Sequence, residues 1–141
     1  MPPAIPSGIS QTWRARHRPI GRPKRRRNRR LDRLNRGDIV TVALQGEFGK
    51  PRPAVIVQSD SFNASHATVS ILPITSTIVG APLFRITIEP SPANGLRSVS
   101  QVMADKVVSV RRERLGPRIG SLDREAMARI GRSLALWLEL A

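Results

Sequence analysis

From residue 38 onward, the chain is built of short runs of β-branched and aliphatic residues separated by brief loops. Such runs are typical of strands in a small β unit rather than of helices in a bundle. Strands are predicted at 38–44, 54–58, 68–74, 84–89, 98–103 and 106–110. Pro73 cannot donate to a strand ladder, so the third run is predicted to lie at a sheet edge or a bulge. The segment 111–120, with Gly116 and Pro117, is predicted to be a turn region.

The last segment is predicted to be a helix. Asp123 can act as its N-cap, and Glu125 lies where the helix dipole favours negative charge. The apolar residues that follow recur at helical spacing; they are Met127, Ile130, Leu134, Trp137, Leu138 and Ala141. Leu136 and Leu140 fall outside this stripe, where they serve either flank packing or a partner surface. The predicted fold class is mainly β with α: a small SH3-like barrel or twisted antiparallel sheet with a C-terminal helix.

Charge is unevenly distributed along the 141 residues, whose formal net charge is +14. Residues 1–36 carry 12 basic groups and one acidic group, whereas residues 37–141 carry a net charge of only +3. We therefore divide the chain into a basic Arg/Pro-rich extension at 1–35, expected to be disordered, and one folded domain at 36–141. The extension is either an arm that holds nucleic-acid phosphates or a variable tail, and composition leaves both open.

Composition excludes several classes of protein and site. There is no cysteine, which excludes a disulfide scaffold, a cysteine nucleophile and a Cys-based zinc site. The two histidines, His17 and His66, cannot hold a metal alone, because about three protein ligands are usual. No apolar run approaches the roughly 18 residues of a membrane span, and the N-terminus lacks the pattern of a secretory signal. We expect a cytoplasmic protein without metal, cofactor or membrane association.

Several short motifs follow one another in a familiar order. They are RGDIV at 36–40, RPAVIV at 52–57, ILPITS at 71–76, SVSQVMADK at 98–106, and Arg114-Leu115 ahead of Gly120 and the terminal helix. In this order and spacing, the chain from Arg36 to Ala141 resembles the MazF/PemK family of type II toxins, the mRNA interferases.

The resemblance implies a compact barrel-like domain that works as a homodimer in the bacterial cytoplasm. It implies an endoribonuclease that cleaves single-stranded RNA at short sequences without a metal, and so inhibits translation and growth. It also implies a cognate antitoxin with a DNA-binding start and an acidic tail, through which the toxin–antitoxin complex binds DNA. The alternative is a non-catalytic toxin of the same fold that binds and poisons DNA gyrase, an activity that would depend on the terminal helix and Trp137.

RNA supplies its own nucleophile, because the 2′-hydroxyl can attack the adjacent phosphorus and leave a 2′,3′-cyclic phosphate. The enzyme must orient that hydroxyl and stabilise the charge of the phosphorane. The resemblance implies that Arg52 stabilises this charge, since a guanidinium stays protonated and cannot be a base. It implies a catalytic or orienting hydroxyl at Thr75. Without the resemblance, Thr75 and Ser76 would be interpreted as a turn-initiating pair that bonds its own backbone.

Asp105 is the third catalytic candidate. Its carboxylate could act as general base, orient Arg52, fix a dimer or pair with a nearby arginine. The chain departs from the family on either side of it: Met103 stands where some members have a catalytic arginine, and Lys106 stands where Gln is usual. Catalysis is therefore expected to rest mainly on Arg52 and Thr75.

RNA contacts are predicted around these residues. The candidates are Gln45, Glu47, Phe48, Lys50 and Ser76. Phe48 could stack on an unpaired base, and Glu47 is a possible base or partner of Arg52. His66 lies outside every family motif and is assigned a structural role.

Overall fold

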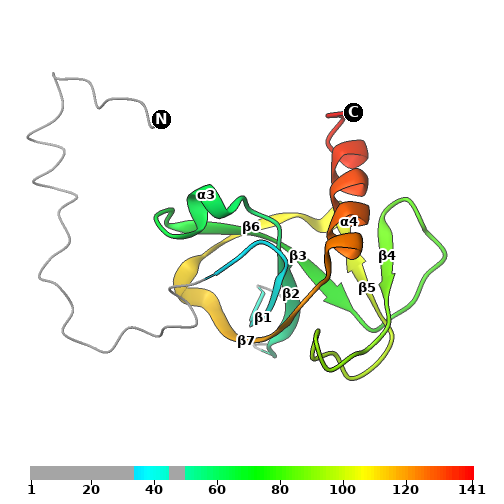
Figure 1. The fold of residues 1–141 in the computed structure, drawn as a ribbon, viewed down its shortest axis with the longest axis horizontal. Helices are drawn as coiled ribbons and strands as arrows, with labels where there is room; N and C mark the ends of the chain where they lie inside the picture. The colour runs from blue at the N-terminus through cyan, green and yellow to red at the C-terminus, as the bar shows by residue number, and fades with distance from the viewer. Residues whose placement is uncertain (1–33, 45–49) are drawn as a thin grey trace, which may run out of the picture.

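The computed structural model describes residues 34–44 and 50–141, and the fold is drawn in Figure 1. Its strands are β1 (Asp38–Val42), β2 (Arg52–Ile56), β3 (Thr68–Thr75), β4 (Arg85–Ile88), β5 (Ser100–Met103), β6 (Val108–Arg111) and β7 (Leu115–Ser121). Its helices are α3 (Asp60–Asn63), α4 (Arg124–Trp137) and the short 3-10 turns η2 (Ala104–Lys106) and η3 (Arg112–Arg114). No helix in this part of the chain is long and apolar enough to cross a membrane.

The strands form one antiparallel sheet in the order β4-β5-β3-β2-β1-β7, and β6 pairs with β3 beside this path. The sheet curls so that β1, β2, β3, β6 and β7 enclose a core, while β4 and β5 extend toward α4 (Figure 1). The predicted class, mainly β with a C-terminal helix, is confirmed.

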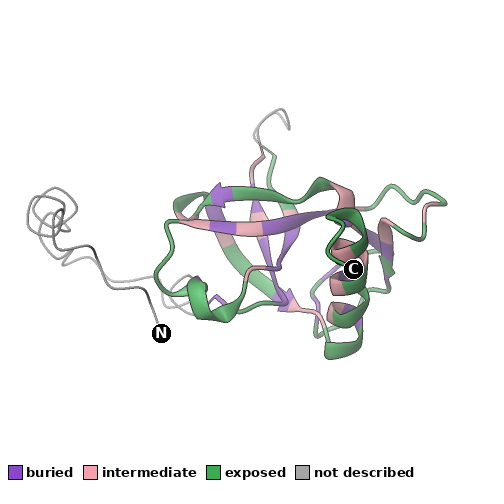
Figure 2. Cartoon of the chain, turned by 90° about the horizontal axis from the view of Figure 1, so that it is seen from above, coloured by how far each residue is buried: buried purple, intermediate pink, exposed green. Residues whose placement is uncertain are grey.

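Alternation along the strands produces two cores on opposite faces of the sheet. Val55 and Leu72 belong to the core under α4, together with the helix residues Ala126 and Ile130. Their neighbours Ala54 and Ile71 belong to the other core, inside the curl. Figure 2 shows buried strand residues between exposed ones, with α4 buried only along its inner side.

The terminal helix begins where it was predicted to begin. The Asp123 carboxylate accepts a hydrogen bond from the backbone N–H of Ala126 at 2.8 Å, as an N-cap does. Toward its end the helix leaves the core, because Trp137 and Leu138 are 46% and 48% exposed. Trp137 meets the ring of Phe84 edge-on, with 5.2 Å between ring centroids. This contact ties the end of α4 to the start of β4.

The prediction of a turn region at 111–120 is wrong, because most of it forms β7. β7 pairs with β1 through an irregular register, and such bulges accommodate Pro117. Glycine is needed in β7 because neighbouring segments approach its backbone too closely for a side chain, and not because the chain turns there. A Cβ at Gly120 would lie 2.3 Å from the carbonyl carbon of Asn94, and one at Gly116 would lie 2.2 Å from Oγ1 of Thr41.

Pro73 was predicted to mark an edge or a bulge, but β3 is an interior strand. One side of β3 pairs with β2. The other side pairs with β6 as far as Ile71 and with β5 from Ile74 onward. Pro73 lies in the gap between these two partners, where a residue without an N–H interrupts neither ladder.

Candidate active site

The two main candidates, Arg52 and Thr75, stand at the strand ends where β2 begins and β3 finishes. The antiparallel register pairs Ala54 with Pro73 and Val55 with Leu72. Arg52 and Thr75 lie two residues beyond the last of these pairs, and the register extended by two residues places them opposite each other. Residues opposed in this way share one face of the sheet, with Cβ atoms about 4.5–5.5 Å apart. The extended register therefore predicts that these two residues lie close together, although 22 residues separate them along the chain.

Both side chains are accessible at this edge of the sheet. Arg52 is exposed and Thr75 is partly exposed, so neither is sealed in the core. Lys50 and Ser76, two of the predicted RNA contacts, are exposed immediately beside them in the chain. The other three predicted contacts, Gln45, Glu47 and Phe48, lie outside the described residues.

The Thr75 hydroxyl is partly committed to its own loop. It accepts a hydrogen bond from the backbone N–H of Thr77 at 3.1 Å, which is the turn geometry considered above as the alternative to catalysis. A hydroxyl has two acceptor lone pairs and one donor hydrogen, so this bond leaves the hydrogen available. The two interpretations are compatible, because the turn fixes an oxygen that can still donate to an incoming oxyanion.

Asp105 pairs with an arginine other than Arg52. Its Oδ1 lies 3.6 Å from Nε of Arg85, and its Oδ2 lies 3.1 Å from Nζ of Lys106. At 3.6 Å the first contact is an ion pair without a hydrogen bond. Of the four roles considered for this carboxylate, the structure shows pairing with a nearby arginine.

Gln101 is a residue that sequence reasoning missed. It pairs with Thr75 across β3 and β5 and with Thr87 across β5 and β4, so all three side chains lie on one face. The Gln101 side chain is only 3% exposed and holds the loop after β3. Its Oε1 accepts from the N–H of Val79 at 3.1 Å, and its Nε2 donates to the carbonyl of Val79 at 3.0 Å. A buried amide needs such partners, but the strand pattern alone does not reveal them.

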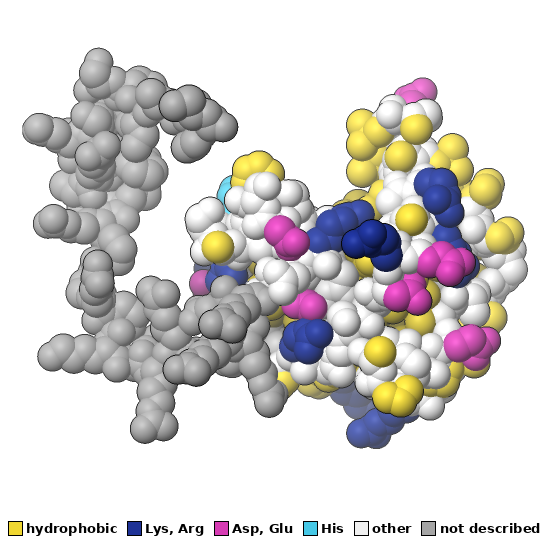
Figure 3. All heavy atoms as spheres, in the orientation of Figure 1, with side chains coloured by type: hydrophobic (Ala, Val, Ile, Leu, Met, Phe, Trp, Pro, Cys, Tyr) yellow, Lys and Arg dark blue, Asp and Glu magenta, His cyan; other side chains and the backbone are white. Residues whose placement is uncertain are grey.

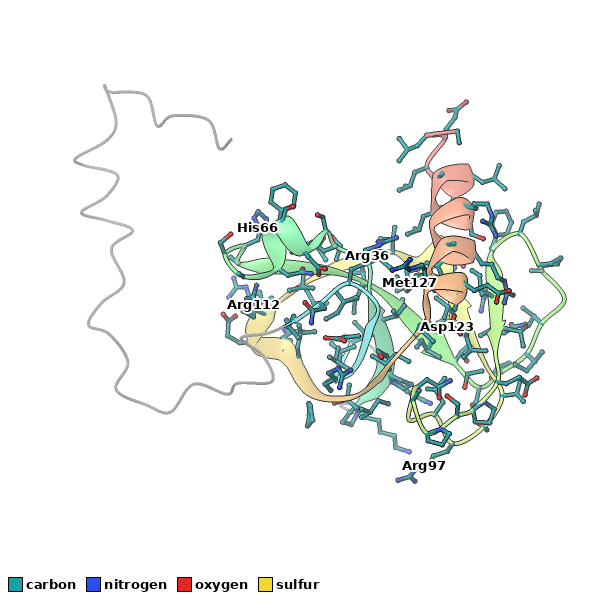
Figure 4. All side chains as sticks on the ribbon, in the orientation of Figure 1. Arg36, His66, Arg97, Arg112, Asp123 and Met127 are labelled. Atoms are coloured by element: carbon teal, nitrogen blue, oxygen red, sulfur yellow. The ribbon has the colours of Figure 1, made fainter. Side chains whose placement is uncertain are left out.

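His66 lies beside α3, on the far side of the domain from α4 (Figure 4). Its backbone carbonyl accepts a hydrogen bond from Nη2 of Arg112 at 3.2 Å, which ties the loop after α3 to η3. The described residues contain no group of three or more His, Cys, Asp or Glu side chains that could hold a metal ion.

The groups available for chemistry at this edge are therefore the Arg52 guanidinium and the Thr75 hydroxyl. A permanently protonated fork at Arg52 can bind two oxygens of a phosphate, and a fixed hydroxyl at Thr75 can donate to a third. These groups stabilise charge that develops on a phosphorus centre, as an oxyanion hole does at a carbonyl.

Comparisons with known proteins show the family to which the chain belongs. The family model described as PemK-like, MazF-like toxin of type II toxin–antitoxin system matches residues 35–138. A curated relative from Mycolicibacterium smegmatis, described as a probable endoribonuclease MazF, is 47% identical over 109 residues, which are 77% of this chain and 99% of the relative.

Solved structures show the same fold. A mycobacterial endoribonuclease in complex with its cognate antitoxin matches with a TM-score of 0.65 and 24% identity, covering 77% of this chain and 98% of that one. Toxin MazF-mt6 of Mycobacterium tuberculosis matches with a TM-score of 0.64 and 23% identity, covering 74% and 98%. The chain therefore belongs to the family of PemK-like, MazF-like toxins of type II toxin–antitoxin systems.

Proposed function

We propose that this chain is an endoribonuclease toxin that cleaves single-stranded RNA through attack of the 2′-hydroxyl on the adjacent phosphorus. The observation that carries the proposal is the register of β2 on β3, which, extended by two residues, places Arg52 opposite Thr75 where neither side chain is buried. The relationship to a probable MazF endoribonuclease at 47% identity supports the same reaction class.

In this mechanism, the bond from the 2′-oxygen to phosphorus forms while the bond from phosphorus to the 5′-oxygen breaks. The products are a 2′,3′-cyclic phosphate and a free 5′-hydroxyl. Arg52 stabilises the negative charge on the phosphorane and assists the leaving 5′-oxygen, and Thr75 donates to a non-bridging oxygen. Glu47, which precedes β2 by five positions in the sequence, is our candidate to accept the 2′-hydroxyl proton. No step of this mechanism uses a metal.

The toxin family implies a partner as well as a substrate. We propose that a cognate antitoxin with an acidic tail binds the edge that carries Arg52, in competition with RNA phosphates, and that two copies of the toxin form the working homodimer in the cytoplasm. Since the attraction is between opposite charges, the complex is expected to weaken as salt is raised. An affinity independent of salt would contradict a charge-driven interface.

The test of the reaction is incubation of a defined RNA with the protein in EDTA, followed by mapping of both product ends. Cleavage with a 2′,3′-cyclic phosphate and a 5′-hydroxyl is expected. Arg52→Ala should abolish cleavage and growth inhibition together, because it removes the charge that stabilises the phosphorane. Arg97→Ala is the matched control, since Arg97 is an exposed arginine in the loop between β4 and β5 (Figure 4).

The same pair of variants examines the gyrase alternative. If Arg52→Ala still inhibits growth as strongly as the parent protein, toxicity does not arise from RNA cleavage and the proposal fails. Loss of toxicity in Arg52→Ala, with toxicity retained in Arg97→Ala, excludes poisoning that relies on the terminal helix alone.

A further inference from the structure

A polar cleft lies at the β4 edge of the sheet, between residues on the face of Thr75 and the helix α4, which packs on the opposite face. It has a volume of about 210 Å³ and lies between the loop after β3, the edge strand β4 and the helix α4. Its lining consists of residues 79–82 of the loop with the side chains of Arg85, Thr87, Gln101 and Arg129. We call this cleft the β4 niche.

The wall of the β4 niche is fixed by hydrogen bonds. Gln101 holds the backbone of Val79 through both its amide nitrogen and its amide oxygen. The same Nε2 lies 3.2 Å from Oγ1 of Thr87, a second residue of the lining. The loop is therefore bound to the sheet at the point where it encloses the niche, so the niche is a formed cavity.

The charges around the niche favour an anion. Arg85 lines the niche and pairs with Asp105, but Asp105 is shared with Lys106. Arg129 approaches from α4, and within the described part of the chain no ion pair or side-chain hydrogen bond is found for it. Arg85 and Lys106 therefore share the Asp105 carboxylate, and Arg129 is the cation of the niche for which no ion pair is found among the described residues.

A second groove, which Arg129 and Thr87 also line, has the opposite character. It has a volume of about 310 Å³, and its lining includes Glu89, Asp123 and Glu125. Figure 3 shows acidic and basic side chains close together along the lower part of α4. Because the carboxylates repel a phosphate, an anion held by Arg129 is expected on the niche side alone.

The position of the niche relates it to the site of cleavage. Thr75 is opposite Gln101, and Gln101 is opposite Thr87, so Thr87 lies two strands away from Thr75 on one face. Two strand spacings are roughly 10 Å. A single-stranded RNA whose phosphate lies between Arg52 and Thr75 reaches that far with about one or two further nucleotides.

We propose that the β4 niche binds a backbone phosphate of the single-stranded RNA, one close in the chain to the phosphate held by Arg52 and Thr75. The proposal rests on the proposed function. Arg129 and Arg85 bind the phosphate oxygens, with the Thr87 hydroxyl beside them. This second contact fixes the strand in register over the reacting groups, while base preference is left to other contacts.

The first test measures binding without cleavage. The probe is a fluorescein-labelled RNA of mixed sequence with 2′-O-methyl groups throughout, which cannot supply the nucleophile, and its affinity is measured by anisotropy at several salt concentrations. Arg129→Gln is expected to weaken binding about fivefold and to lower the salt slope by about 0.7, the loss of one phosphate contact. The matched control is Arg132→Gln, since Arg132 is exposed on the same helix and does not line the niche.

The second test uses neutral methylphosphonates, placed one at a time along a cleavable RNA. One position near the cleaved bond should raise KM for the parent protein, with kcat nearly unchanged, and have little effect on Arg129→Gln. Arg129→Lys should recover part of the affinity. An Arg129→Gln variant with the affinity and salt slope of Arg132→Gln would overturn the niche proposal.

The two proposals can fail separately. If Arg52-dependent cleavage occurs but Arg129→Gln matches its control, the reaction stands and the niche is wrong. If no RNA is cleaved but Arg129→Gln loses affinity for the methylated probe, the reaction is wrong and the niche stands as an RNA phosphate site. Thermal unfolding of each variant shows whether a loss reflects misfolding.

Discussion

The Thr75 hydroxyl differs from an ordinary surface hydroxyl because a hydrogen bond within its own loop fixes the position of its oxygen. With one lone pair engaged by the N–H of Thr77, the oxygen is held at the end of β3, opposite Arg52. A group fixed before substrate arrives costs little reorganisation during the reaction. The turn that could have argued against a catalytic role therefore supports it.

Replacing Thr75 with valine tests this hydroxyl at nearly constant shape. Thr75→Val removes the donor to the phosphorane, so kcat is expected to fall about 100-fold, the usual cost of one such donor. Thr75→Ser keeps the hydroxyl and should retain most of the rate. Single-turnover cleavage of a defined RNA measures both rates, and a valine variant as fast as the serine variant would exclude Thr75 from the chemistry.

At the scale of residues, the sequence predicts part of the site. Arg52 and Thr75 could be found because each lies in a short motif whose order resembles a known family. Arg85, Gln101 and Arg129 could not, because no motif gave them a role: strand pairing places Arg85 and Gln101, and the helix α4 brings Arg129 to the same niche. Asp105 was identified, but its partner was not, since a sequence does not show which arginine the fold places beside a carboxylate.

At the scale of elements, the alternation of apolar and polar side chains predicts most strands. It does not predict β7, where close approach of neighbouring backbone requires glycine instead of an apolar side chain. The first six strands and the terminal helix were recognised from apolar periodicity and from the N-cap Asp123. β7 was not recognised, because its glycines and Pro117 are typical of a turn when their neighbours are unknown. These residues are in a strand because another strand and a loop pass too close for a side chain.

Gly120 gives the test of this explanation. Gly120→Ala would place a Cβ against the backbone of Asn94, which cannot move aside as a flexible side chain can. We expect a loss of about 2–3 kcal/mol in the free energy of unfolding, measured by urea denaturation. Gly80→Ala is the control, since a Cβ there meets no atom within 4 Å, and it should change stability by less than about 0.5 kcal/mol. Equal stability of the two variants would show that close packing does not explain β7.

At the scale of the whole molecule, we propose that the basic extension at 1–35 and the domain at 36–141 have separable roles. The curated relative is matched over 99% of its own length by 109 residues of this chain, so a protein of about that length exists in this family. Most of the +14 net charge, +10 from 11 basic groups and one acidic group, lies in residues 1–34, before the family match at 35–138. Charge of that density attracts RNA of any sequence.

A variant that begins at Leu34 tests this division. We expect it to cleave a short RNA with kcat within about twofold of the full chain, because the described strands and helices are all retained. Its affinity for long RNA should fall, and its binding should depend less steeply on salt. Loss of cleavage of short RNA in a variant that melts normally would assign the extension a part in the reaction.

One side of β3 pairs with β6 as far as Ile71 and with β5 from Ile74 onward, and this division affects which part of the sheet opens first on heating. Two residue pairs, at Ile74 and Thr75, join β4 and β5 to β3 in the sheet, while α4 and η2 pack on these strands and their connecting loop contacts β7 at Gly120. A hairpin attached by so short a seam is expected to detach in a local opening, before the curled part of the sheet unfolds. Since Thr75 forms one of these two pairs, detachment would displace it and abolish RNA cleavage while the curled part of the sheet remained folded. Mild heating should therefore abolish RNA cleavage at a temperature where circular dichroism still reports a folded sheet.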